Sequence, residues 1–456
     1  MHRLNRLRGF AAPKVNRFIE FLTLQGITMA ANLLYGFLCL RILTIPEYAK
    51  YIVVFVFMST LTLLMDVSFS STLLPLIGHR IDDRKLIADY VASLRQLARW
   101  LFLAAIPVVL IVYPLMVRRQ DWGWKTVAGM LAILLVAGWF ARVSGAYGAV
   151  LIVRRDRRMW YGVQMISAFG TLALLIVFWA LHGLNVFSAI LINVVGIIFV
   201  ASAYYARARH LLGVGGVSSP RIRREIVHLA APNIAYAIFY AFQGQIGMFL
   251  IAVFGHTHAV ASLGALTRLA RIYALFGYMG PLLIEPYFAK LGRERLLRNY
   301  ALAAALVSLF AATVTALAYC LPQVFLWILG PKYANLRLEV VLMLAVAGLG
   351  FVYDMLGIIN SARKFVYWWN GIATIVLTIV VQIVCILRVD LSSVRGILMF
   401  SLATLTTWLV VAVATGVYGF LRGPREYIST HLEADALSSQ IISSEGLLEE
   451  QGETFQ

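Results

Sequence analysis

The sequence predicts an all-α integral membrane protein with about twelve transmembrane helices, arranged as two six-helix bundles with pseudo-symmetry. Three observations predict this fold class. The 456-residue chain is 61% hydrophobic and only 13% charged, which is too apolar for a water-soluble domain. Apolar stretches of about 20 residues, the length that crosses a bilayer, recur along the chain. A polar linker divides these stretches six and six.

The predicted spans follow from hydropathy and end at polar residues. They lie at residues 18–43, 51–77, 98–117, 125–153, 160–182, 185–206, 228–254, 258–289, 299–320, 337–360, 366–388 and 394–421. Runs such as 131–138 do not alternate between polar and apolar residues, so they do not fit transmembrane β-strands. The first span has no small-residue cleavage site, which predicts a retained anchor.

Composition divides the chain into five regions. These are a basic cytoplasmic N-terminus (1–17), an N-terminal six-helix bundle (18–209), a cytoplasmic linker (210–224), a C-terminal six-helix bundle (225–422) and an acidic tail (423–456). The linker is rich in Gly and Ser and has no hydrophobic period. The tail is too polar to form a packed core, so we expect it to be a disordered cytoplasmic extension.

Positive charge is unevenly distributed. We number the loops between the predicted spans from the N-terminus. Of the 39 Lys and Arg residues, about 27 lie in the termini and the even-numbered loops, and about 9 lie in the odd-numbered loops. This asymmetry predicts that both termini are cytoplasmic. The net charge of +18 therefore reflects membrane orientation, and we expect no nucleic-acid partner.

A basic segment precedes the third span. Residues 82–85 read Asp-Asp-Arg-Lys and are followed by apolar residues on one helical face, from Leu86 to Leu97. With Arg95 and Arg99 near anionic headgroups, this pattern predicts an interfacial helix at the cytoplasmic surface. A direct continuation of the neighbouring spans is the alternative.

Three arginines lie well inside predicted spans, away from the span ends, where an unpaired charge costs about 2.5–3.5 kcal/mol on insertion scales. They are Arg142, Arg268 and Arg271. The last two are three residues apart, so they project from one helix face near mid-membrane. Because guanidinium groups match phosphate oxygens, we hypothesise a central cationic cavity for a diphosphate. Structural ion pairs with Asp66 or Asp354 are the alternative.

The first span also carries a polar stripe. Gln25, Thr28 and Asn32 recur at steps of three and four and lie on one face. They could line the cavity, together with Asp66 of the second span, and hydrogen-bond sugars. They could equally hold helices together, at about 0.6 kcal/mol per contact.

Two further acidic residues lie within spans. Glu285 follows Gly280 and Pro281 in the lower part of the eighth span, which we expect to be kinked. Proton or sodium coupling through Glu285 or Asp354 is one interpretation, and ion pairing is the other. The sequence contains no phosphate-binding loop, nucleophile elbow or metal motif, so it predicts neither a cofactor nor an enzyme.

Several short motifs resemble one known family. Residues 41–51 read Arg-Ile-Leu-Thr-Ile-Pro-Glu-Tyr-Ala-Lys-Tyr and resemble the first outside loop of polysaccharide flippases. Residues 66–69, 329–333 and 360–364 resemble further elements of that family. With the span count, the resemblance extends to about residue 422. The family is the O-antigen and exopolysaccharide exporters of the multidrug, oligosaccharidyl-lipid and polysaccharide (MOP) superfamily.

This resemblance implies a fold like that of the MATE transporters and a flippase function. Such proteins move undecaprenyl-diphosphate-linked oligosaccharide from the inner to the outer leaflet by alternating access. The implied location is the bacterial inner membrane, and the implied partners are the lipid-linked oligosaccharide, membrane lipids and other polysaccharide assembly proteins. Arg142, Arg268 and Arg271 are the residues that would supply the family's cationic cavity.

Three other interpretations remain open. A purely structural membrane subunit is one, although it would leave the buried charges without a function. A drug or cation antiporter of the same superfamily would favour an acidic cavity over three buried arginines. A membrane polymerase or ligase acting on lipid-linked sugars would usually carry a large outside loop, whereas the outside loops of this sequence are short.

Overall fold

The computed structural model describes residues 24–422, except for residues 67–68, 78–79, 81, 121, 278–279 and 366. The predictions for the basic segment 1–17 and the tail 423–456 lie outside the described residues. Within the described part, the chain forms helices joined by short connections.

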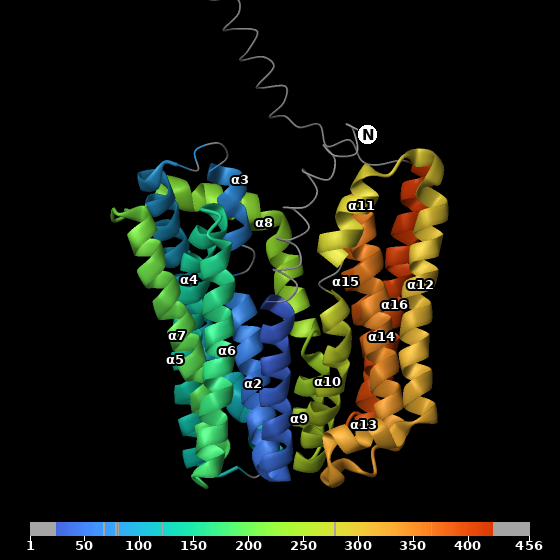
Figure 1. The fold of residues 1–456 in the computed structure, drawn as a ribbon. Helices are drawn as coiled ribbons and strands as arrows, with labels where there is room; N and C mark the ends of the chain where they lie inside the picture. The colour runs from blue at the N-terminus through green and yellow to red at the C-terminus, as the bar shows by residue number, and fades with distance from the viewer. Residues whose placement is uncertain are drawn as a thin grey trace, which may run out of the picture.

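The helices fall into two groups along the chain (Figure 1). The N-terminal half contains a helix over residues 24–42, then α2 (Ile45–Asp66), η1 (Ser70–Thr72), α3 (Leu73–Ile77), α4 (Arg84–Val117), η2 (Arg118–Gln120), α5 (Trp124–Val153), α6 (Arg157–Ala180) and α7 (Val186–Leu212). The C-terminal half contains α8 (Pro220–Gln243), α9 (Ile246–Phe254), α10 (Thr257–Gly277), η3 (Gly280–Ile284), α11 (Glu285–Lys290), α12 (Arg293–Cys320), α13 (Pro322–Leu329), η4 (Pro331–Tyr333), α14 (Arg337–Ala362), α15 (Trp368–Arg388) and α16 (Val394–Arg422).

Length and composition identify the membrane-spanning helices. Among the described residues, nine helices are long and apolar enough to cross a membrane, and there are ten if α8 and α9 form one bent span. The two remaining predicted spans correspond to the helix over residues 24–42 and to α10, which contains two arginines. The chain is therefore a multi-pass, all-α membrane protein, as predicted.

The second predicted span has different bounds in the structure. Instead of covering 51–77, the helix α2 starts at Ile45 and ends at Asp66. Its start is fixed by a capping box, because the backbone N–H of Thr44 donates to Glu47 Oε2 (3.1 Å) and the N–H of Glu47 donates to Thr44 Oγ1 (3.4 Å). The short helix α3 follows as a separate element.

The prediction of an interfacial helix over residues 82–99 is wrong. Those residues form the first half of α4, a single 34-residue helix whose N-terminus is capped by Asp83. The apolar face that was expected to contact lipid, including Ile87, Val91 and Leu94, is buried inside the protein. Packing against neighbouring helices therefore replaces the expected membrane contact.

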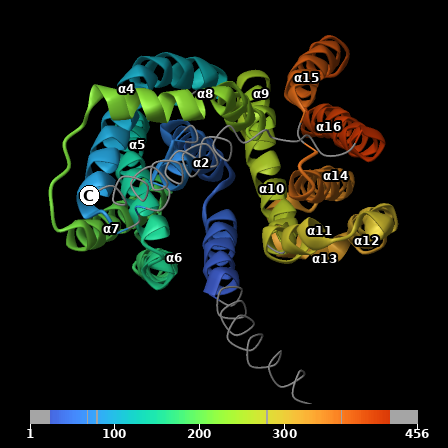
Figure 2. The ribbon, with the colours of Figure 1, turned by 90° about the horizontal axis from the view of Figure 1, so that it is seen from above.

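The helices α8 and α9 form a broken pair that joins the two halves. Figure 2 shows α8 running beside α4 of the N-terminal half before the chain turns into α9. Tyr90 Oη donates to Glu225 Oε2 (2.8 Å), and Arg223 Nη1 donates to Gln96 Oε1 (2.8 Å). The chain then bends by 50° between Gln243 and Ile246. The predicted span 228–254 is thus two helices, the first of which lies on the opposite half.

The two halves meet at one end of the molecule. In Figure 1 they lie close together near α13 and diverge toward α3 and α11. Lys332 Nζ donates to the carbonyl oxygens of Arg41 (2.9 Å) and Leu43 (2.8 Å), and Arg41 Nη2 donates to the carbonyl of Trp327 (2.6 Å). We call this set of contacts, residues 41–43 with residues 327–332, the closed end.

A second contact supports the closed end. Gln120 Nε2 donates to the carbonyl oxygens of Ala252 (3.0 Å) and Gly255 (3.1 Å), while Thr257 Oγ1 donates to Gln120 Oε1 (2.8 Å). The polar contacts of the closed end are therefore distributed over several loops of both halves.

Lys332 is partly buried at the closed end. This burial lowers the pKa of its ammonium group, and the nearby Glu47 carboxylate opposes the shift.

Replacing Gly264 with Val is expected to destabilise the protein by about 1–3 kcal/mol, because it overpacks the interface between α10 and α2. A Cβ at this position would lie 2.6 Å from Ile52 Cγ1. Thermal unfolding of the detergent-purified protein measures the effect. The matched control is Gly357→Val on α14, where a Cβ meets no atom within 4 Å. Equal melting temperatures for the two variants would contradict the close approach of these helices.

Candidate substrate cavity between the two halves

A cavity of about 420 Å³ lies between the halves. One wall comes from α2 of the N-terminal half, and the others come from α8, α9, α10, α14 and α16. We call it the central cavity. It contains Arg268, Arg271 and Asp354, so the structure brings together three of the side chains that the sequence predicts to be functional.

Arg268 lies in an aromatic cradle supplied by the other half. Its side chain is 2% exposed, its Nε donates to Tyr48 Oη (3.4 Å), and its guanidinium carbon lies 4.9 Å from the centre of the Phe55 ring. One terminal nitrogen, Nη2, has no hydrogen-bond partner within the described residues. The absence of a side chain at Gly36 makes room for the guanidinium, since a Cβ there would lie 2.9 Å from Nη1. The cation is thus held by aromatic rings, and one of its nitrogens is buried without an acceptor among the described residues.

Arg271 lies on the same aromatic ring. Its guanidinium carbon is 5.4 Å from the centre of the Phe55 ring, so this ring contacts both arginines. Asp354 on α14 lines the cavity from another side, and it forms no ion pair with Arg268 within 4 Å. The alternative of an Arg268–Asp354 ion pair is therefore wrong. The side chain of Asp66 lies outside the described part, so pairing with Asp66 stays untested.

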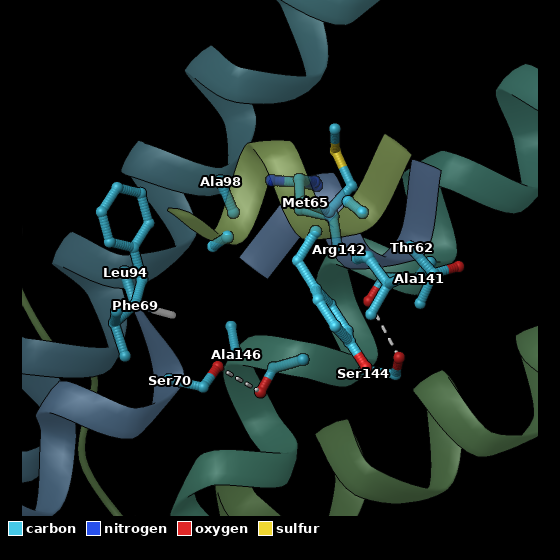
Figure 3. A pocket seen from close by; sticks show the side chains of 15 residues that line it. Thr62, Met65, Phe69, Ser70, Leu94, Ala98, Ala141, Arg142, Ser144 and Ala146 are labelled. Atoms are coloured by element: carbon cyan, nitrogen blue, oxygen red, sulfur yellow. Dashed lines mark hydrogen bonds between the residues drawn. The ribbon is translucent and has the colours of Figure 1, made fainter. Parts of the chain in front are cut away.

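Arg142 does not lie in the central cavity. It lines a separate cavity of about 460 Å³ between α2, α4, α5 and α8 (Figure 3), which we call the Arg142 cavity. Its guanidinium stacks 4.0 Å from the ring centre of Trp139 and, among the residues that the structure describes, donates once, from Nη1 to the carbonyl of Arg95 (3.3 Å). The predicted single cavity with three arginines is thus two cavities, which share Tyr240 in their walls.

The predicted polar lining is also divided. Thr28 and Asn32 line a third pocket inside the N-terminal half, whereas the half-buried Gln25 lines none of the described cavities. Glu285 begins α11, is exposed and lies in none of these cavities. The expected kink nevertheless exists, because α10 ends at Gly277 and the chain continues through the π-helical turn η3.

Sequence reasoning missed the polar groups at the helix break. Gln243 and Gln382 exchange two hydrogen bonds, from Gln243 Nε2 (3.1 Å) and from Gln382 Nε2 (2.7 Å), and Gln382 also donates to Thr404 Oγ1 (3.3 Å). This pair connects the end of α8 to α15 and α16. The sequence Gln243-Gly244-Gln245, a glycine between two amides inside an apolar run, is the signal that could have revealed the break.

The fold and the cavity define a class of protein. Two groups of membrane-spanning helices, closed at one end around a cavity at their interface, form a polytopic membrane protein with the two-halved architecture of alternating-access transporters.

Comparison with solved structures specifies this fold further. A lipid II flippase, MurJ, in an inward closed conformation aligns with a TM-score of 0.65 and 11% identity, over 88% of this chain and 89% of that chain. An inward-facing multidrug resistance MATE family transporter of the MOP superfamily aligns with a TM-score of 0.63 and 13% identity, over 87% and 94%. A MATE protein in complex with MaL6 aligns with a TM-score of 0.57 and 14% identity, over 89% and 95%.

The chain therefore has the MATE-like fold of MOP-superfamily transporters and flippases, as its sequence predicts. No protein-family model and no curated protein sequence matches the chain.

Proposed function

We propose that this protein moves undecaprenyl-diphosphate-linked oligosaccharide from the inner to the outer leaflet of the bacterial inner membrane, by alternating access between its two halves. The observation that supports this proposal most directly is the pair Arg268 and Arg271. Both line the central cavity and both contact the ring of Phe55. Planar guanidinium groups bind phosphate oxygens in two-pronged hydrogen bonds. The comparison with a lipid II flippase supports this substrate class at the level of the fold.

The distribution of buried charge supports an anionic substrate. Arg142 and Arg268 form no ion pair with any described carboxylate, and each leaves a guanidinium nitrogen without a partner. Uncompensated cations in a membrane are costly. A phosphate that entered these cavities would offset that cost, whereas a cationic substrate would add to it.

The closed end fits the same proposal. The positive-inside distribution of the sequence supports a cytoplasmic location for both termini and for the end that carries α3 and α11. The central cavity would then be closed toward the outside, ready to receive substrate from the inner leaflet. Membrane lipids and other polysaccharide assembly proteins are the expected partners.

Proteoliposomes test this function directly. We expect the purified protein to translocate a fluorescent polyprenyl-diphosphate oligosaccharide between leaflets, and not a neutral glycolipid with the same sugars, because the arginines require phosphate. The measurement is the fraction of labelled lipid that becomes accessible to a membrane-impermeant quencher. Equal movement of both lipids, or no movement across a panel of diphosphate lipids, would reject the proposal.

One observation favours a second function. Asp354 contributes a carboxylate to the same cavity as the arginines, and a carboxylate is what a cation or drug antiporter would use. Export of a fluorescent cationic dye from the same proteoliposomes, lost in Asp354→Asn, would support the antiporter. The flippase proposal expects no dye export.

A further inference from the structure

The third pocket lies inside the N-terminal half and adjoins the Arg142 cavity. It measures about 250 Å³ and is formed by the helix over residues 24–42 together with α2, α5, α6 and α7. We call it the polar pocket. Its wall shares Thr62, Ala141 and Ser144 with the Arg142 cavity, so the two spaces are neighbours. Because the Arg142 cavity in turn shares Tyr240 with the central cavity, the three spaces follow one another in a row.

The polar pocket is lined by uncharged hydrogen-bonding groups. Amides and hydroxyls from three helices face it, namely Thr28, Asn32, Gln164, Ser167, Thr171 and Asn193. None of the residues that line it is charged. Cations are held in proteins mainly by carboxylates and other oxygen ligands of net negative charge, so this lining favours a neutral, hydroxyl-rich ligand over a metal ion.

Three of these six polar groups connect helices. Gln164 Nε2 donates to Tyr204 Oη (3.2 Å) and Ser167 Oγ to the Gly196 carbonyl (3.2 Å), both from α6 to α7, and Asn193 interacts with Tyr35.

The other three make no hydrogen bond to another helix among the described residues. Thr28 Oγ1 donates to the Leu24 carbonyl (2.8 Å) and Thr171 Oγ1 to the Ser167 carbonyl (2.9 Å), both within their own helices. Such bonds leave the lone pairs of each hydroxyl oxygen as acceptors. The Asn32 side chain forms no hydrogen bond within the described part of the chain, although it lines the pocket. The pocket therefore presents both donors and acceptors.

Arg142 lines the cavity that adjoins the polar pocket. Its side chain is 7% exposed, and only one of its five N–H donors has an acceptor among the described residues, the Arg95 carbonyl. Figure 3 shows its side chain in the same cavity as Ser144, which also lines the polar pocket. A buried guanidinium with unused donors beside an uncharged polar pocket matches a sugar phosphate, in which a charged phosphate is attached to a ring that carries hydroxyls.

We propose that the N-terminal half contains a sugar-phosphate site, in which the polar pocket binds the first sugar of the lipid-linked oligosaccharide and Arg142 binds the diphosphate together with Arg268 and Arg271 of the central cavity. This inference rests on the flippase function proposed above. A volume of about 250 Å³ is below the ~300–1,000 Å³ typical of pockets for drug-sized ligands, so the pocket takes a single sugar ring. The polar pocket would thus determine sugar specificity, while Arg142 and the two arginines of the central cavity share the diphosphate.

Binding measurements on the full-length protein in nanodiscs test this site. The probes are undecaprenyl diphosphate without sugar and the same lipid carrying one N-acetylglucosamine, glucose or galactose. We expect the wild-type protein to bind at least one sugar-bearing lipid about tenfold more tightly than the bare lipid. Asn32→Leu and Asn193→Leu, which are nearly isosteric, should reduce this preference to below about twofold without changing the affinity for the bare lipid.

Arg142→Gln should weaken the binding of every diphosphate lipid about tenfold, and Arg142→Lys should restore part of it. Thermal unfolding of each variant separates this effect from misfolding. Thr313→Val is the matched control for the amide variants, because Thr313 is an exposed residue of α12 outside all the cavities. It should leave the sugar preference unchanged.

The outcomes distinguish this inference from the proposed function. If the wild-type protein binds and translocates these lipids but shows no preference for any sugar, or if the preference survives in both asparagine variants, the sugar site is rejected and the flippase function stands. If the wild-type protein neither binds nor translocates any diphosphate lipid, the flippase function itself is rejected, and the sugar site with it.

Discussion

Replacing Arg268 with Gln is expected to lower the rate of lipid translocation about a hundredfold. The reason is the loss of a buried cation facing the substrate phosphate, a change that costs about 3 kcal/mol when one member of a buried charge pair is removed. The guanidinium of Arg268 is 2% exposed and has an unsatisfied nitrogen. The measurement is the initial rate of leaflet exchange in proteoliposomes that contain equal amounts of folded protein.

Two further variants make this result specific. Arg268→Lys keeps the charge but loses the planar donor fork and the stacking on Phe55, so we expect an intermediate rate. Arg388→Gln removes an exposed arginine at the end of α15, away from the cavities, and should transport at the wild-type rate. A wild-type rate for Arg268→Gln, with unchanged thermal stability, would remove Arg268 from the transport path.

Cross-linking the closed end is expected to stop transport completely. Lys332 donates to the Arg41 carbonyl across the two halves, so cysteines at positions 41 and 332 are within reach of a short cleavable bifunctional reagent. Alternating access requires these loops to separate, and a covalent bridge prevents this. The translocation rate of the cross-linked protein should fall to that of empty liposomes and should recover when the bridge is cleaved.

The cross-linking experiment needs a cysteine-free background and single-cysteine controls. Cys39, Cys320 and Cys385 are free cysteines and are replaced first. Each single-cysteine variant treated with the reagent shows the effect of modification without a bridge. Undiminished transport by the cross-linked protein would mean that the closed end does not open during transport, and the alternating-access proposal would have to be abandoned.

The sequence predicted most spans within a few residues because long apolar runs between charged loops leave few alternatives. The bounds of α5, α14 and α16 show this agreement. The errors arose where local signals compete with hydropathy. The capping box at Thr44 starts α2 earlier than hydropathy indicates, and the cap at Asp83 starts a helix that continues without interruption through Pro107 into the third span.

The candidate site was predictable only in part. The three-residue spacing of Arg268 and Arg271 is a local property of one helix, so their common location followed from sequence. Whether Arg142 joins them depends on how the halves pack, and no local pattern encodes that. The polar pocket had a usable signal, since Gln164, Ser167 and Thr171 are spaced by three and four residues on α6, but its partners lie on other helices.

The charges of the central cavity also determine how membrane voltage acts on the protein. Arg268, Arg271 and an ionised Asp354 give the empty cavity a net charge of +1, and a diphosphate diester would change this to −1. An inside-negative potential does work of about 2.3 kcal/mol per elementary charge per 100 mV. The potential would therefore favour the outward-facing state when the diphosphate is bound and the inward-facing state when the cavity is empty. Both steps of the transport cycle would thus be favoured without a coupling ion.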